Sequence, residues 1–300
     1  MRGLGFAAAI AASILFGVGG TFAQFLFQHR GVNIDWLVTM RLLFAGPALL
    51  LISAAGGRRI FAVWRGRDWA PLVLFGIVGM MPVQYTYMAA INASNTATAT
   101  VLQFTSPAMV AVWMALVGSK RPGPRELAAV GLAMLGTFFL VTHGQLGVLS
   151  ISAWALFWGL ASAAAAAFNS LQPTALLKKH GAALVAGWGM VIGGLALSFF
   201  HAPWQIEGRW DATAGLFFAF ILVLGTLAAF YLFNKALRLV GAQTTILLTC
   251  AEPLSAAVLA VWWLGVAWGP MDWLGTVLIL ATIVLLAREE TEEQLAEKAT

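Results

Sequence analysis

The stretch QYTYMAAINASNTATATVLQFTSPAMVAVW, residues 84–113, is matched later in the chain by FYLFNKALRLVGAQTTILLTCAEPLSAAVL, residues 230–259. Superposed without a gap, the two copies align Pro107 with Pro253. Each copy reads as the end of one apolar helix, a short turn and a second apolar helix with a proline near its middle. Polar residues precede both prolines, including Glu252 in the second copy. Duplicated membrane helices interrupted by proline and polar groups are typical of a transport site at a repeat interface.

The composition is that of a membrane protein. Hydrophobic residues make up 61% of the 300 residues and charged residues only 10%, against about a quarter charged in soluble globular domains. The basic residues lie in short connections between apolar runs, a pattern that orients a membrane protein and does not indicate nucleic-acid binding. The single cysteine, Cys250, excludes an intrachain disulfide and a metal cluster built from thiolates.

Ten apolar runs are long enough to predict membrane-spanning helices, each of which needs roughly 20 residues. They lie at residues 4–27, 34–53, 69–91, 94–117, 126–142, 151–171, 182–200, 212–233, 242–264 and 271–287. The first run is longer than the apolar core of a cleaved signal peptide, so we expect it to be retained. The predicted fold is therefore an all-α membrane protein with ten transmembrane helices.

The loop charges test this count independently. All of the 17 basic residues except Arg30, Arg41 and Arg209 fall on one side of the membrane if the ten runs alternate in direction. A missed or extra helix would scramble that segregation. By the positive-inside rule, both termini are predicted to be cytoplasmic, in a bacterial-type inner membrane.

The repeat extends beyond the opening stretch. Gly31, after the first run, matches Gly181, after the sixth, so the repeated unit is five helices. Because five is odd, the second unit starts from the opposite side of the membrane, and the two units are predicted to be inverted copies. We place the first repeat at residues 1–145 and the second at 146–287, as one integral domain. Residues 288–300 carry five glutamates and are predicted to be a charged cytoplasmic tail.

Ten helices arranged as five plus five, the duplicated pattern that ends in Pro107 and Pro253, and Arg41 in the second run together resemble the drug/metabolite transporter superfamily. Within it, residues 4–287 resemble the EamA-type ten-helix branch. The resemblance implies a secondary transporter, often an exporter of amino acids or other small metabolites. It also implies a central cavity lined by the first, third, fourth, sixth, eighth and ninth spans, with the second span outside its wall. The aromatic amino acid exporters are the nearest type, because the polar spans also carry Trp, Tyr and Met.

Glu252 is the one acidic residue predicted to lie near the middle of the membrane. An ionisable group at that depth is costly and usually faces a pathway or a partner. One interpretation is proton coupling, in which the carboxyl group exchanges a proton during transport. The other is structural, with the side chain satisfying carbonyl groups that Pro253 leaves unpaired. The sequence favours neither.

Arg41 is the only cation well inside a predicted span. Its guanidinium could hold a substrate carboxylate, because the two groups match in geometry. It could also anchor helix packing or extend toward the membrane surface. The structural interpretation is favoured, because the family resemblance places the second span outside the cavity wall.

Polar and aromatic residues on the remaining inward faces are the candidates for contact with the substrate. They are Gln24, Gln84, Tyr87, Thr98, Leu102, Ser106, Trp158, Asn169 and Thr244. Small residues such as Gly17 and Ser162 at helical spacing are more simply explained by close helix packing. Pro107 and Pro253 are predicted hinges, because each removes a backbone hydrogen bond.

Motifs that would indicate other chemistry are absent from the sequence. It has no phosphate-binding GxxxxGK[ST] loop, no HExxH and no Gly-x-Ser-x-Gly. We therefore expect no cofactor and no metal, and alternating access without enzymatic activity. The alternatives are an intramembrane enzyme on lipid-linked substrates, with Glu252 as acid and Arg41 as anion holder, a lipid scramblase, or a receptor that does not transport. The expected partners are a small-molecule substrate and membrane lipids. The expected state is a monomer or a weak dimer, since Gly189 and Gly193 would suit an internal contact or a dimer equally.

Overall fold

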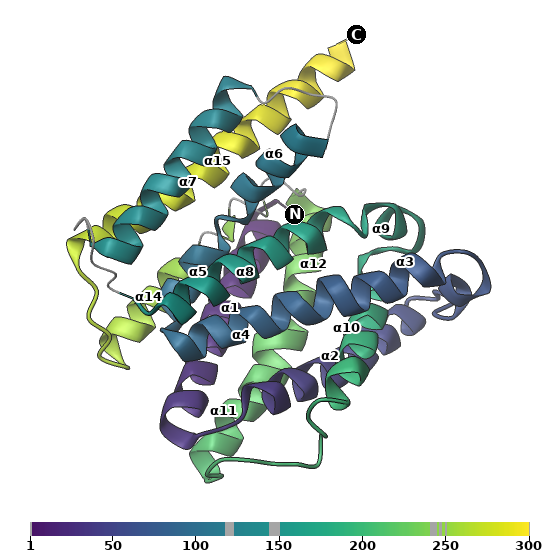
Figure 1. Cartoon of the computed structure of the whole chain (residues 1–300). Coiled ribbons are helices and arrows are strands. Elements are labelled where there is room, and N and C mark those ends of the chain that lie inside the picture. The colour runs from purple at the N-terminus through teal and green to yellow at the C-terminus, as the bar shows by residue number, and fades with distance from the viewer. Residues whose placement is uncertain are drawn as a thin grey trace.

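The computed structural model describes residues 2–117, 123–143, 151–240, 245, 248–249 and 251–299. Within these ranges all regular secondary structure is helical (Figure 1). The all-α membrane fold predicted from the sequence is therefore confirmed, and the chain is a multi-pass membrane protein.

The first five spans are built from the following helices. The first two are α1 (Arg2–Arg30) and α2 (Ile34–Ala55), and the short η1 (Ala62–Arg65) lies in the connection after them. The third span is α3 (Trp69–Leu74), the π-helical η2 (Phe75–Met80) and α4 (Met81–Ala93) in succession. The fourth is α5 (Thr96–Gln103) and α6 (Ser106–Val117), and the fifth is α7 (Pro124–Thr142).

The second five spans follow the same plan. The sixth is α8 (Ala153–Leu171), extended by α9 (Thr174–His180), and the seventh is α10 (Ala182–Ser198). The eighth combines α11 (Ala212–Leu222), the π-helical η3 (Val223–Ala228) and α12 (Ala229–Val240). The ninth includes α14 (Ala251–Trp262), and the tenth is α15 (Pro270–Ala299). Where the structure describes them, the predicted apolar runs thus contain helix, and five of the described helical segments are individually long and apolar enough to cross a membrane.

The fourth span differs from the prediction of one helix with a proline near its middle. It is divided at Phe104 and Thr105, so that Pro107 lies in the first turn of α6. Proline is tolerated in a first turn because the N–H group that it lacks has no partner within the helix there. The hydroxyl of Thr105 donates to the carbonyl of Leu102 at 2.7 Å and satisfies one acceptor at the break.

The last span also extends further than expected. Helix α15 continues to Ala299, through the residues predicted to form a charged tail. Glutamate and lysine are good helix formers, so the charged composition of this segment is compatible with a continued helix.

The packing of the spans is repeated in the way that an inverted duplication requires. Helix α2 packs against α10, and α7 against α15, so each pair joins equivalent helices of the two repeats. Figure 1 shows α7 and α15 side by side, with α6 next to them. Helix α1 packs against α12 and α14, and its counterpart α8 packs in the same way against α4, α5 and α6.

Glycines bring several of these helices into backbone contact. A Cβ atom on Gly46 of α2 would lie 2.9 Å from the carbonyl oxygen of Gly187 in α10. One on Gly193 would lie 3.0 Å from the carbonyl oxygen of Gly76 in η2. Gly189 and Gly193, which suited either an internal contact or a dimer, therefore serve an internal contact.

Candidate functional site

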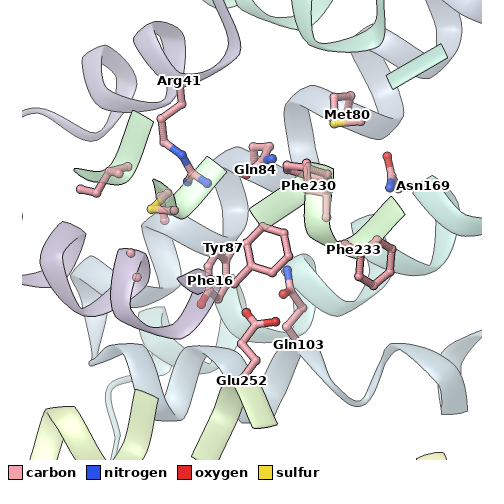
Figure 2. A pocket seen from close by; sticks show the side chains of 16 residues that line it. Phe16, Arg41, Met80, Gln84, Tyr87, Gln103, Asn169, Phe230, Phe233 and Glu252 are labelled. Atoms are coloured by element: carbon pink, nitrogen blue, oxygen red, sulfur yellow. The ribbon is translucent and has the colours of Figure 1, made fainter. Parts of the chain in front are cut away.

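A cavity of about 240 Å³ lies at the centre of the bundle (Figure 2). Its wall combines one cation, one carboxylate, three amides, four aromatic rings and several small or apolar residues. The lining residues are Phe16, Gly19, Gly20, Arg41, Met80, Val83, Gln84, Tyr87, Met88, Gln103, Asn169, Ile221, Gly225, Phe230, Phe233 and Glu252. Both repeats contribute to the wall.

Arg41 reaches this cavity from α2. Its residue surface is 8% exposed, and its Nε donates to Thr226 Oγ1 at 3.3 Å. Its Nη1 atom is buried without a hydrogen-bond partner among the residues that the structure describes. An unpaired buried donor on a charged group is costly unless a ligand or water satisfies it. Arg41 is the one residue of α2 in the lining, so its long side chain reaches the cavity although its helix contributes no other residue to the wall.

The π-helical turn η3 holds the partner of Arg41. Thr226 is 1% exposed, and its hydroxyl donates to the carbonyl of Ile221, five residues earlier, at 2.7 Å. Next to it, Gly225 allows α1 to come close, since a Cβ atom on Gly19 would lie 3.3 Å from the Cα of Gly225. π-Helical turns inside α-helices are frequent at functional sites. The equivalent span of the first repeat carries η2, which contributes Met80 to the same cavity.

Glu252 lines the cavity from the first turn of α14. A negative charge is favoured at this end of a helix by the helix dipole. Gly17 of α1 packs against the same turn, where a Cβ atom would lie 2.8 Å from the carbonyl oxygen of Glu252. In Figure 2 the side chains of Glu252 and Arg41 point into the cavity from opposite sides. A solute between them would meet one anionic and one cationic group.

Amide and hydroxyl groups supply the rest of the polar wall. Gln103 Nε2 donates to Ser162 Oγ at 2.6 Å, and the hydroxyls of Tyr87 and Thr100 are hydrogen bonded at 2.7 Å. Asn169 Oδ1 is buried without a partner in the described part of the chain. This acceptor and the free donor of Arg41 are complementary to a ligand that carries both kinds of group.

Aromatic rings form the apolar wall. Phe16 packs edge to face against Phe230 with ring centroids 5.2 Å apart, and Phe233 also lines the cavity. Phe230 and Phe233 are the repeat counterparts of Gln84 and Tyr87 in the superposition of the two copies. At these two positions the first repeat thus supplies side chains with polar groups, and the second repeat supplies phenylalanine rings.

Several residues predicted from the sequence meet in this cavity: Arg41, Gln84, Tyr87, Asn169 and Glu252. Others lie outside its lining, and their contacts explain their polarity. Gln24 accepts hydrogen bonds from the backbone and hydroxyl of Thr96, and Thr98 is bonded to Asn95, which caps α5.

Apolar contacts account for two further candidates outside the lining. Leu102 is fully buried against Gly159, and Trp158 packs edge to face against Tyr85.

The remaining predicted residues also lie away from the lining. Ser106 begins α6, and Pro253 is buried in α14. Pro107 falls in the first turn of α6, and Thr244 lies outside the described residues.

The prediction missed Gln103, Phe16, Phe230 and Phe233 as lining residues. Gln103 carried a signal, because it is one of the polar groups that precede Pro107. Phe230 and Phe233 could have been found by transferring Gln84 and Tyr87 to their repeat counterparts. Phe16 carried no signal, because an aromatic residue in a membrane helix is equally suited to packing.

Among the described residues no group of three His, Cys, Asp or Glu side chains could hold a metal ion. The cavity presents one carboxylate and no imidazole.

Comparison with known proteins gives the family. The sequence profile of the EamA-like transporter family matches residues 3–142 and 153–288. The chain is 42% identical over 282 residues to the "Uncharacterized inner membrane transporter YicL" of Salmonella typhimurium, covering 93% of each chain. It is 28% identical over 270 residues to the "Uncharacterized transporter YwfM" of Bacillus subtilis, covering 86% of each. A solved crystal structure shares the fold with a TM-score of 0.63 at 17% identity, over 96% of this chain and 99% of that one. The chain therefore belongs to the EamA-like transporter family.

Proposed function

We propose that this protein is a secondary transporter that exports amino acids or related small metabolites across the inner membrane by alternating access. The proposal is carried by the presence of Arg41 and Glu252 in the lining of one central cavity. The Nη1 atom of Arg41 has no hydrogen-bond partner there among the described residues. The protein's membership of a transporter family supports the coarse activity, and the lining of the cavity supports the chemistry that we propose for the solute. In this proposal the protein has no enzymatic activity, and its termini are cytoplasmic.

The wall of the cavity suits a zwitterionic solute. The guanidinium of Arg41 binds the carboxylate, to which its planar fork is complementary. Glu252 faces the ammonium group, and Asn169 Oδ1 accepts a further hydrogen bond. Phe16, Phe230 and other rings cover an apolar or aromatic side chain. The volume of about 240 Å³ is below the roughly 300–1,000 Å³ of sites for drug-sized ligands, which favours a solute the size of one amino acid.

Glu252 also gives the cavity a group that can exchange a proton. When it is protonated it no longer attracts an ammonium group, so the proton and the solute would compete for one side chain and proton uptake would favour solute release. This is the simplest coupling that one buried carboxylate permits. Pro107 and Pro253 are the proposed bending points: Pro107 follows the break between α5 and α6, and Pro253 follows Glu252, which lines the cavity.

The test is flux in liposomes that contain only the purified protein. A panel of aromatic, aliphatic and charged amino acids and quaternary amines is offered as competitors of a labelled amino acid. Aromatic and aliphatic zwitterions are expected to compete best, and their amine analogues without a carboxylate poorly. Arg41→Gln should lose this preference for a carboxylate. A protein that moves no small solute from the panel contradicts the proposal.

A second candidate function, lipid scrambling, is favoured by one observation. An apolar groove of about 620 Å³ lies between α6, α7 and α8, lined by residues such as Met109, Trp113 and Met134. Thr105 and Thr137 are its polar residues, and the Thr105 hydroxyl is already bonded within its own helix turn. The groove thus suits acyl chains and offers no charged path for a headgroup. Transfer of a fluorescent lipid between leaflets in the same liposomes distinguishes the two functions.

A further inference from the structure

The helices that pack most closely do not belong to the same sequence repeat. Helix α1 of the first repeat packs against α11, η3, α12 and α14 of the second. Helix α8 of the second repeat packs in turn against η2, α4, α5 and α6 of the first. Each set contains the first span of one repeat and the third and fourth spans of the other. The symmetry that relates the two repeats therefore maps one set onto the other. We call α1, α11, η3, α12 and α14 the first unit, and α3, η2, α4, α5, α6, α8 and α9 the second unit.

An ion pair joins the two repeats at one end of the first unit. Arg30, the last residue of α1, lies 2.9 Å from the carboxylate of Asp211, which caps the N-terminus of α11. The same carboxylate group accepts a hydrogen bond from the backbone of Ala214 at 2.7 Å. The backbone N–H of Arg209 also donates to the carbonyl of Arg30 at 2.7 Å.

A second ion pair of the same design lies at the end of the second unit. Lys179 and His180, the last residues of α9, lie 2.6 and 2.8 Å from the carboxylate of Asp68, which immediately precedes α3. Here the guanidinium of Arg58 donates to the carbonyl of His180 at 2.5 Å.

The two arrangements are equivalent under the repeat. In each, a basic residue ends the first span of one repeat and pairs with the aspartate that begins the third span of the other. A glycine with positive φ follows each basic residue: Gly31 at 65° and Gly181 at 85°. Because the repeats are inverted, the two ion pairs lie at opposite faces of the membrane. Each joins two helices of one unit, so it stabilises that unit and does not link one unit to the other.

We propose that the bodies that move in alternating access are these two exchanged units, each clamped by its own ion pair, and not the two sequence repeats. The inference rests on the transport function proposed above. In this arrangement α1 and α12 stay together while the first unit rocks against the second. The pairs α2–α10 and α7–α15 connect equivalent helices of the two repeats and flank both units.

The described contacts between the two units gather at one end. At the end where α1 stops and α5 begins, Gln24 accepts hydrogen bonds from Thr96, and Gln28 donates to the carbonyl of Ser94 at 3.0 Å. Ala97 of α5 packs with Ala257 and Ala260 of α14 at the same end.

The inverted repeat predicts an equivalent contact of α8 with α12 and with residues 242–249 when the opposite end is closed. Most of residues 242–249 lie outside the described part of the chain, and α8 and α12 do not pack to a comparable extent within it. Among the described residues, the units therefore meet at the end where α1 stops and α5 begins, which the positive-inside rule predicts to be the outer face.

Two pairs of buried alanines test the assignment. Ala9 of α1 and Ala236 of α12 pack within the first unit, and Ala97 and Ala260 pack across the two units. Each pair is replaced by cysteines, as Ala9→Cys with Ala236→Cys and as Ala97→Cys with Ala260→Cys, in a Cys250→Ser background. A disulfide in the first pair should leave transport close to that of the reduced protein. A disulfide in the second should abolish transport, and reductant should restore it.

The opposite results overturn the inference: transport that survives oxidation of the pair across the units, or that is lost on oxidation of the pair within one unit. If the Cys250→Ser parent moves no solute, the transport proposal fails instead, and the units are tested by distances between spin labels. Labels at the exposed positions Ile14 and Val258 report within the first unit, and labels at Trp154 and Val258 report across the units. When pH or solute changes, the inference requires that the distance between labels at Ile14 and Val258 stays fixed and that the distance between labels at Trp154 and Val258 shifts. A fixed distance across the units contradicts it.

Discussion

The side chain of Arg41 is held by Thr226: its Nε donates to the Thr226 hydroxyl at 3.3 Å, and that hydroxyl donates in turn to the carbonyl of Ile221 at 2.7 Å. The contact joins α2 of the first repeat to the π-helical turn of the second. One face of the guanidinium is therefore fixed by the protein, while Nη1 stays available to a ligand. This relationship makes Thr226 a positioning residue for the carboxylate site that we propose.

Replacing Thr226 by valine should weaken binding of carboxylate solutes, because valine keeps the shape and removes the acceptor. Hydrogen bonds to charged groups contribute about 1.5–3 kcal/mol, so the KM for an amino acid should rise by roughly one to two orders of magnitude. The KM of an amine without a carboxylate should not change, and Thr226→Ser should restore amino acid binding.

The control is Thr21→Val, which removes a buried hydroxyl that donates to the carbonyl of Gly17 outside the cavity lining. An equal loss of affinity for both kinds of solute in Thr226→Val would mean that Thr226 only supports the fold.

Close packing between α1 and α14 gives a prediction about stability. A Cβ atom on Gly17 would lie 2.8 Å from the carbonyl oxygen of Glu252, a contact with backbone that side-chain rotation cannot relieve. Gly17→Ala should lower the free energy of unfolding by about 1–3 kcal/mol, as overpacking does in a dense interior. Gly131→Ala in α7, which meets nothing within 4 Å, should be neutral or slightly stabilising because alanine is the better helix former. Thermal unfolding in detergent compares the two, and equal melting temperatures would contradict the packing.

The two ion pairs predict how stability depends on pH. The hydrogen bond from Lys179, followed by that from His180, lowers the pKa of Asp68 below its ordinary value of 3.8. The backbone N–H of Ala214, followed by Arg30, lowers the pKa of Asp211 in the same direction. A carboxyl group whose folded pKa is lowered stabilises the fold above its unfolded pKa, and this contribution is lost as the pH falls through the folded pKa. Stability should therefore decrease as the pH falls below about 4, the ordinary range of an aspartate.

Asp68→Asn and Asp211→Asn remove the titrating groups. In each variant the melting temperature should therefore fall less steeply below about pH 4 than in the unchanged protein. The side chains of Asp68 and Asp211 are 24% and 52% exposed to solvent, so the effect should be small and should weaken at high salt. Asp35→Asn, in the first turn of α2, is the matched control. If the melting temperatures of Asp68→Asn and Asp211→Asn fall below about pH 4 as steeply as that of the unchanged protein, the ion pairs contribute nothing to stability.

Much of the fold was predictable because membrane burial imposes long apolar helices and loops retain their charges. All ten apolar runs contain helix among the residues that the structure describes, and the duplicated stretch led directly to Gln84, Tyr87 and Glu252. The break at Phe104 and Thr105 was harder, because a proline in a sequence pattern is compatible with a kink in one helix or with the start of another.

The partners of single side chains could not be predicted. Gln24 and Thr98 have the polarity of site residues, yet their hydrogen bonds are used to join α1 to α5 and to cap α5. For Arg41 the sequence left a carboxylate-binding and a structural role open and favoured the latter, because the position of its helix could be inferred and the reach of its side chain could not. Phe16 is indistinguishable in sequence from the many phenylalanines that pack between helices. These assignments depend on three-dimensional contacts that a linear pattern does not contain.

Glu252→Gln tests whether the cavity carboxylate couples transport to protons. Glutamine keeps the size and the hydrogen bonding of the side chain but cannot exchange a proton, so solute counterflow, which needs no net driving force, should persist. Transport driven by a pH gradient should be lost, and the rate should no longer vary with pH. The control is Glu207→Gln, which changes a carboxylate that accepts a hydrogen bond from Asn33 at 3.0 Å in the connection before α11. Because a purely structural Glu252 would be replaced by glutamine with its hydrogen bonds intact, unchanged pH dependence in Glu252→Gln assigns the residue to support of the backbone around Pro253. Loss of gradient-driven flux together with retained counterflow assigns it to coupling.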